Sequence, residues 1–94
     1  MSLKNFIHKV EDNRGVFKNT DKVHSQLETI YYNGSFRMKQ QASEMKMWGI
    51  TLISQMCEQL SVEEQDNLLD WFYENPNRKI YQVKDAFNRL LMEK

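Results

Sequence analysis

The residues that could carry out chemistry are few in this chain of 94 residues. Cys57 is the single cysteine and lies in an apolar stretch, where burial raises the pKa of a thiol and lowers its reactivity. The three glycines, at positions 15, 34 and 49, are isolated, so there is no glycine-rich loop of the kind that cradles a phosphate. We predict a packing role for Cys57 and no nucleotide site of a known motif.

Metal ligation and acid–base catalysis are the other chemistry to consider. His24 and Glu28 lie four residues apart, on one face of a predicted helix, and His8 is the second histidine. Two histidines without a cysteine pair make a poor zinc site, because structural zinc takes four clustered ligands. The acidic residues at a predicted helix start suit capping and solvation better than catalysis: Glu63, Glu64, Asp66 and Asp70. The sequence therefore predicts no catalytic residue, no metal site, no cofactor and no enzymatic activity.

A long apolar seam dominates the elements that would position a site. Between residues 35 and 60, apolar and small residues recur at steps of four or three: Met38, Ala42, Met45, Gly49, Leu52, Met56 and Leu60. Such steps keep the side chains on one side of an α-helix, so we predict a continuous helix over residues 35–60 with Ser35 as its N-cap. A helix of about 26 residues spans roughly 39 Å, which is longer than a domain of this size needs internally.

Shorter amphipathic segments flank this helix. Helical spacing of apolar residues, capping residues and one proline predict four further helices, over approximately 3–13, 20–33, 61–75 and 80–91. Gly34 is expected to end the second of them as a left-handed residue, and Ser61 to Glu64 to form a capping box. The expected fold is all-α, a small orthogonal or bundle-like domain of about five helices around the long central helix, with residues 1–94 as one domain.

Composition is that of an ordinary folded chain. The formal net charge is zero, 40% of the residues are hydrophobic and 28% are charged. These proportions argue against a disordered chain, and no apolar run is long enough to span a membrane. A single cysteine cannot form an internal disulfide, which suits a reducing compartment. We therefore expect a cytoplasmic protein that does not bind membranes.

Small residues in the seam indicate a helix contact. Ala42 and Gly49 lie seven residues apart and would let another helix approach closely at two points on one line. That helix belongs either to this chain or to a partner, and the sequence leaves both alternatives open. The residues predicted to bind a protein partner are Ala42, Met45, Trp48, Gly49, Leu52, Met56 and Trp71.

Nucleic-acid binding is the alternative. Residues 38–57 partly match a helix-turn-helix motif, with Ala42 at its small position, but Lys46 stands where the motif usually turns on glycine and Gln55 where an apolar residue belongs. Zero net charge argues against extensive phosphate binding. The cations that would contact nucleic acid are Arg37, Lys39, Lys46, Arg78, Lys79, Lys84 and Arg89.

One segment resembles part of a known family. Leu60–Glu64 running into Leu68–Phe72 is loosely similar to a stretch of the small helical anti-sigma co-activator proteins of T-even phages. The likeness covers under a fifth of the chain and consists of a capping box plus amphipathic spacing, so it assigns no family.

The function expected from these patterns is non-catalytic. We predict a protein-interaction module or a small regulatory or accessory protein, with a homodimer through the long helix as one form of that interaction. The alternative is a small DNA-binding transcriptional regulator with a degenerate helix-turn-helix around residues 38–57.

Overall fold

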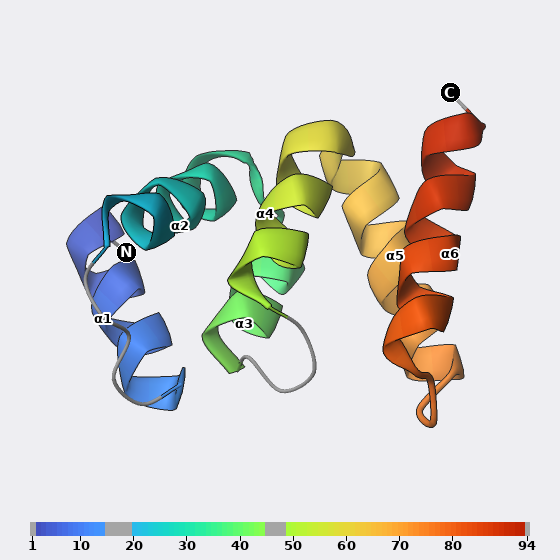
Figure 1. The fold of residues 1–94 in the computed structure, drawn as a ribbon, viewed down its shortest axis with the longest axis horizontal. Coiled ribbons are helices and arrows are strands. Elements are labelled where there is room, and N and C mark those ends of the chain that lie inside the picture. Colours follow the sequence, from blue (N-terminus) through green and yellow to red (C-terminus); the bar gives the residue numbers. More distant parts are fainter. Residues whose placement is uncertain (1, 15–19, 45–48, 94) are drawn as a thin grey trace.

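The computed structural model describes residues 2–14, 20–44 and 49–93. Within these ranges the chain forms six helices and no strand: α1 (Leu3–Arg14), α2 (Asp21–Asn33), α3 (Phe36–Glu44), α4 (Ile50–Gln59), α5 (Val62–Glu74) and α6 (Ile80–Met92). Helices α1 and α2 lie at one end of the long axis and α6 at the other (Figure 1). The prediction of a small all-α bundle is confirmed.

The predicted continuous helix over residues 35–60 is wrong, and two shorter helices stand in its place. Helix α3 ends at Glu44, and Gly49 has φ −75° and ψ 151° immediately before α4 begins. These angles are extended, whereas an α-helix needs ψ of about −42°, so helical hydrogen bonding does not run through Gly49. Residues 45–48 lie outside the described residues. The described part of the chain thus has six helices rather than about five, and no long helix organises it.

The buried face also changes between the two helices. In α3, the predicted Met38 and Ala42 are fully buried. In α4 and its C-cap, the predicted Met56 and Leu60 are buried, whereas the predicted Leu52 is only partly buried. Ile50 and Ile53, which the seam did not include, also enter the core. Each helix therefore turns its own apolar face to the core, and steps of four and three across a break do not require one continuous backbone.

Three helices begin at side-chain N-caps, and the predicted caps Ser35 and Ser61 are among them. The hydroxyl of Thr20 accepts a hydrogen bond from the amide three residues later at 3.3 Å, and that of Ser35 does the same at 3.0 Å. Ser61 and Glu64 form the reciprocal capping box, with distances of 3.2 and 3.0 Å. These side chains satisfy amides that the first helical turn leaves without partners, which fixes where α2, α3 and α5 begin.

Gly34 differs from its prediction. Its φ of −81° and ψ of 144° are extended, not left-handed. A Cβ atom at this position would lie 2.5 Å from the carbonyl oxygen of Ile30 and 3.2 Å from the sulfur of Cys57. Glycine is therefore required because a side chain would collide with the last turn of α2 and press on Cys57 of α4, and not because of an unusual backbone conformation.

A fully buried glutamine joins four helices at this point. The Oε1 atom of Gln65 accepts a hydrogen bond from the Ser35 amide at 2.7 Å. Its Nε2 atom donates to the carbonyl oxygens of Asn33 and Leu60, both at 3.0 Å, and lies 3.4 Å from that of Cys57. One side chain of α5 thus binds backbone groups where α2 and α4 end and where α3 begins, groups that a helix cannot satisfy internally.

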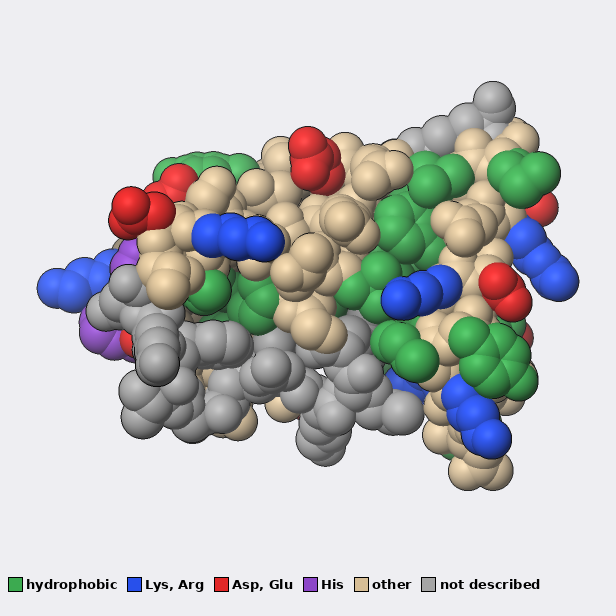
Figure 2. All heavy atoms as spheres, in the orientation of Figure 1, with side chains coloured by type: hydrophobic (Ala, Val, Ile, Leu, Met, Phe, Trp, Pro, Cys, Tyr) green, Lys and Arg blue, Asp and Glu red, His purple; other side chains and the backbone are tan. Residues whose placement is uncertain are grey.

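Helix α6 completes the domain from one side. It packs mainly on α5, through Val83 and Phe87. Hydrophobic side chains gather between α4 and α6 on the face shown in Figure 2. In the turn that joins α5 to α6, Arg78 donates to the carbonyl oxygens of Phe72 and Asn75 at 3.0 and 3.1 Å, and its guanidinium lies 4.6 Å from the centre of the Phe72 ring. Arg78 therefore holds the turn through local contacts.

Candidate binding site

The described residues among those predicted to bind a partner do not form one surface. Ala42 and Met56 are fully buried in the core of this chain, and Leu52 is partly buried. Gly49 is exposed, and no atom lies within 4 Å of a Cβ built on it. Met45 and Trp48 lie outside the described residues. Ala42 is therefore covered by this chain itself, whereas none of the described helices packs against Gly49 within 4 Å of a Cβ there.

A hollow of about 460 Å³ lies between α1, α3 and the end of α2. We call it the aromatic–lysine pocket. Its lining consists of three aromatic rings, two lysines and two neutral polar side chains: Phe6, Tyr31, Phe36, Lys9, Lys39, Gln40 and Ser43. This volume falls within the range of about 300–1,000 Å³ that ligand sites occupy in proteins.

Ring contacts and one hydrogen bond set the shape of this pocket. The rings of Phe6 and Tyr31 lie 5.7 Å apart between centres, and Phe6 is almost fully buried. The amide of Asn13 donates to the Ser43 hydroxyl at 3.1 Å, which ties α1 to α3. Phe36 is the first residue of α3 and is 74% exposed. The pocket thus has a fixed inner wall and an exposed aromatic edge.

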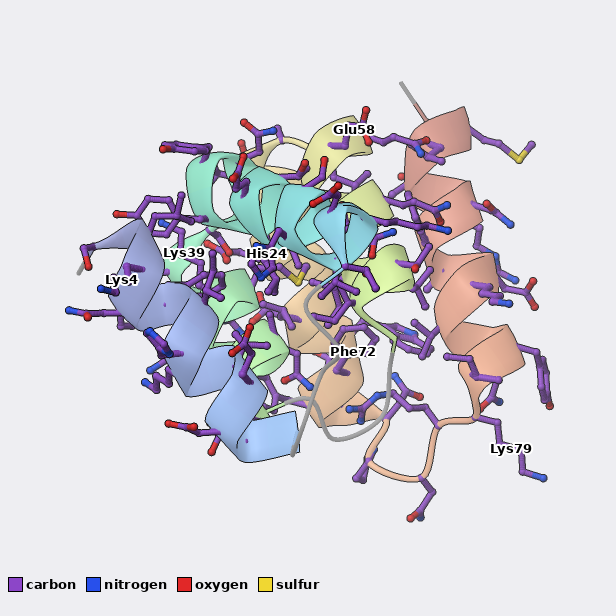
Figure 3. The ribbon with its side chains drawn as sticks, turned by 60° about the vertical axis from the view of Figure 1, so that its left-hand side comes forward. Lys4, His24, Lys39, Glu58, Phe72 and Lys79 are labelled. Atoms are coloured by element: carbon purple, nitrogen blue, oxygen red, sulfur yellow. The ribbon has the colours of Figure 1, made fainter. Side chains whose placement is uncertain are left out.

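The charge of the pocket is positive. The Nζ atom of Lys39 lies 5.0 Å from the centre of the Tyr31 ring, among the side chains between α1 and α2 in Figure 3. Within the described residues, neither Lys9 nor Lys39 forms an ion pair closer than 4.0 Å. Both ammonium groups remain available to an anion.

Trp71, the last predicted partner residue, borders a second concave surface. Two hollows of about 170 and 280 Å³ follow the line where α5 meets α6, and both are lined by Trp71, Ala86 and Arg89. Leu90 lines the first hollow, and Tyr81 lines the second. We call the two together the α5–α6 groove. Trp71 is only partly buried, so it is available at a surface.

The cations predicted to contact nucleic acid are divided between internal and surface roles. Arg37 pairs with Asp70 at 2.8 Å, which raises the pKa of the guanidinium, and it also lies 5.5 Å from the Tyr73 ring. Arg78 holds the α5–α6 turn. The other predicted cations lie elsewhere. Lys39 lines the aromatic–lysine pocket, and the exposed cations at or on α6 are Lys79, Lys84 and Arg89. Lys46 lies outside the described residues.

The second helix of the helix-turn-helix alternative corresponds to α4. Half of its ten residues are buried, and it packs most closely on α2. Its exposed side chains are Thr51, Gln55, Glu58 and Gln59. Glu58 is the only charged residue of α4. It lies near the C-terminal end of the helix, at the outside of the molecule in Figure 3. A recognition helix approaches phosphates and base edges, where this helix would bring a negative charge.

The side chains considered above for chemistry include Cys57 and His24. Burial raises the pKa of Cys57 to about 12, and the charge of Lys39 offsets this shift only in part. His24 lies 3.7 Å from Glu11 of α1. In the part of the chain that the structure describes, no group of three or more His, Cys, Asp or Glu residues is arranged to hold a metal ion.

Comparisons with known protein families, with curated proteins and with solved structures give no significant match to this chain. Among the described residues, no helix combines the length and apolar character that crossing a membrane requires. The sequence did not single out Phe36 or Lys9 as binding residues. Phe36 directly follows the N-cap Ser35, and that position was the available sign that it faces water.

Proposed function

We propose that this chain is a non-catalytic binding protein that holds an acidic, apolar segment of another protein in the aromatic–lysine pocket. The observation that carries the proposal is Phe36, which is 74% exposed at the edge of a hollow with an aromatic wall. Exposed aromatic surface is unfavourable in water, and aromatic residues are enriched where proteins meet. The proposal keeps the cytoplasmic location that the single cysteine predicts.

The extent of the aromatic surface favours a polypeptide over a small molecule. Tyr32 is 69% exposed, and its ring lies 5.1 Å from that of Tyr31, which lines the pocket. A small ligand inside the hollow would cover Tyr31 and leave the outer faces of Tyr32 and Phe36 in water. A polypeptide can place one apolar side chain in the hollow and cover both outer rings with its neighbouring residues.

The lysines define the charge of that polypeptide. Lys9 and Lys39 approach the hollow from α1 and α3, and carboxylates beside the inserted apolar side chain would neutralise them. Charge complementarity at the edge of an interface accelerates association and fixes its orientation. A nucleic-acid strand is less well matched, because two lysines neutralise few phosphates and the chain has no net positive charge.

A labelled test peptide in which Glu alternates with Phe and Leu checks the proposal by fluorescence polarisation. We expect it to bind, and a peptide with Lys in place of every Glu to bind at least about tenfold more weakly. In NMR titrations, the amide signals of pocket residues should shift. Phe36→Ser and Lys39→Glu should each weaken binding about tenfold, a typical loss when an interface anchor or a charge is removed.

Tyr73→Ser is the matched control, because Tyr73 is 70% exposed and lies on α5, outside the pocket lining. It should leave peptide affinity unchanged. Equal binding of the acidic and basic peptides, or full affinity in Phe36→Ser, would show that the pocket is not the binding site. Tighter binding of a double-stranded DNA oligonucleotide than of the acidic peptide would favour the nucleic-acid alternative.

A further inference from the structure

We infer that two copies of this chain associate through the α5–α6 groove, with the two α6 helices antiparallel about a two-fold axis. This dimer differs from the predicted one, because it uses α6 rather than a long central helix. The groove carries partly exposed apolar surface from Trp71, Ala86 and Leu90. Asp85 and Arg89 lie along its α6 side.

The two charges identify a second copy as the occupant. Asp85 and Arg89 are exposed and, within the described residues, form no ion pair closer than 4.0 Å. They are four residues apart, so they lie one turn apart on the same side of α6. In an antiparallel pair about a two-fold axis, every contact occurs twice with the roles exchanged. Asp85 then faces Arg89 of the partner subunit, and Arg89 faces Asp85 of the partner subunit.

The shape of the groove suits the same arrangement. Ala86 lies between the two charges in sequence and lines both hollows, and its small side chain lets two helix axes approach to about 8 Å. Trp71 and Leu90 would contribute apolar surface on either side of the contact between the two α6 helices. Since each subunit contributes α5 and α6, the interface becomes a four-helix arrangement, which buries such grooves on both subunits. The contact is isologous and therefore closes at two copies.

This dimer leaves the aromatic–lysine pocket free. The pocket is formed by α1, α2 and α3, and Figure 1 places α1 and α2 at the opposite end of the molecule from α6. The inference therefore does not depend on the proposed function, and a failure of peptide binding would not bear on it. A dimer would present two pockets at its outer ends.

Sedimentation equilibrium of the full chain over a wide concentration range tests the inference. We expect a reversible approach to twice the monomer mass of 11.3 kDa. Asp85→Arg and Arg89→Asp should each weaken dimerisation about 100-fold, because like charges would then face each other twice across the axis. Circular dichroism should show that both variants keep the helical content of the native chain, since both positions are exposed.

Restoring the charge pairing distinguishes this interface from any other. An equimolar mixture of Asp85→Arg and Arg89→Asp should form a heterodimer, and the double variant Asp85→Arg/Arg89→Asp should again form a homodimer. Lys84→Asp reverses an exposed charge beside the groove residues without lining either hollow, and it should dimerise as the native chain does. A native chain that stays monomeric at about 1 mM, where even weak complexes form, overturns the inference. So do single variants that dimerise normally, or a mixture that fails to pair.

Discussion

Two glycines stand at helix junctions of this protein and serve opposite purposes. Gly34, between α2 and α3, and Gly49, before α4, both have extended backbones with negative φ. A Cβ at Gly34 would collide with Ile30 and approach Cys57, whereas a Cβ at Gly49 would meet nothing within 4 Å. The same residue type in the same backbone region therefore marks a crowded junction in one place and an open one in the other.

The crowded junction is where distant parts of the chain are joined. Gln65 binds the backbone on both sides of Gly34, at Asn33 and Ser35, and the thiol of Cys57 lies against Gly34. Gln65 lies 30 positions from Ser35 and 32 positions from Asn33 in sequence. The crowded junction thus connects helices that are distant in sequence. Substitutions there should lower the free energy of unfolding more than substitutions at Gly49 do.

Removal of the Gln65 amide should have the largest effect. Gln65→Met keeps an unbranched side chain of similar length but leaves the buried Ser35 amide and the carbonyl groups of Asn33 and Leu60 without this partner. Each unsatisfied buried group costs about 1–3 kcal/mol, so we expect a loss of about 3 kcal/mol in the free energy of unfolding. Urea denaturation monitored by circular dichroism measures it. Gln55→Met on the exposed side of α4 is the control, and an equal cost in both variants would remove Gln65 from its central role.

A methyl group should distinguish the two junctions directly. Gly34→Ala forces a carbon against a carbonyl oxygen and a buried sulfur, and overpacking of this kind costs about 1–3 kcal/mol. Gly49→Ala meets open space and should change stability by less than about 0.5 kcal/mol. Thermal and urea unfolding of the two variants under the same conditions checks this. Similar costs for both would mean that the junctions do not differ in packing.

Sequence patterns predicted the capping residues at the helix junctions and missed the buried glutamine, Gln65. Ser35, Thr20 and Ser61 were identifiable because a cap acts on an amide only two or three residues away. Gln65 acts on backbone groups far away in sequence, and a glutamine on a helix surrounded by polar residues is normally solvent-exposed. Apolar spacing likewise predicted the two buried apolar residues of α3, Met38 and Ala42, but not the break before α4. Spacing reports side-chain direction and not backbone continuity.

The candidate pocket shows the same division. Its aromatic residues are visible in the sequence, but Phe6, Tyr31 and Phe36 come from three helices whose packing the sequence did not predict. Lys9 joins them only because α1 packs on α3. Of the residues that line the α5–α6 groove, the sequence singled out Trp71 and Arg89, and neither as part of a groove.

The Cys57 thiol should make the crowded junction sensitive to alkaline pH. Burial raises the pKa of the folded thiol from 9.0 to about 12. Between these values the unfolded state ionises first, so stability is complete below pH 9 and falls as the pH rises toward 12. The expected loss is about 1.4 kcal/mol at pH 10. Because lysine and tyrosine also titrate there, the measurement is the difference in pH dependence between the native chain and Cys57→Ala, and identical slopes would contradict the burial of the thiol.

A capping side chain at Gly49, the open junction, should raise the stability of the protein. Gly49 is the N-cap of α4 but has no side chain to bind the first amides of that helix. Gly49→Ser adds a hydroxyl acceptor, and it also restricts the unfolded chain at a backbone conformation that serine adopts without strain. Together these effects should raise the free energy of unfolding by about 0.5–1 kcal/mol. Gly49→Ala separates them, because it restricts the unfolded chain equally and supplies no acceptor. If Gly49→Ser is no more stable than Gly49→Ala in urea denaturation, a side-chain cap does not stabilise α4. The open space beside Gly49 is then not explained by helix capping.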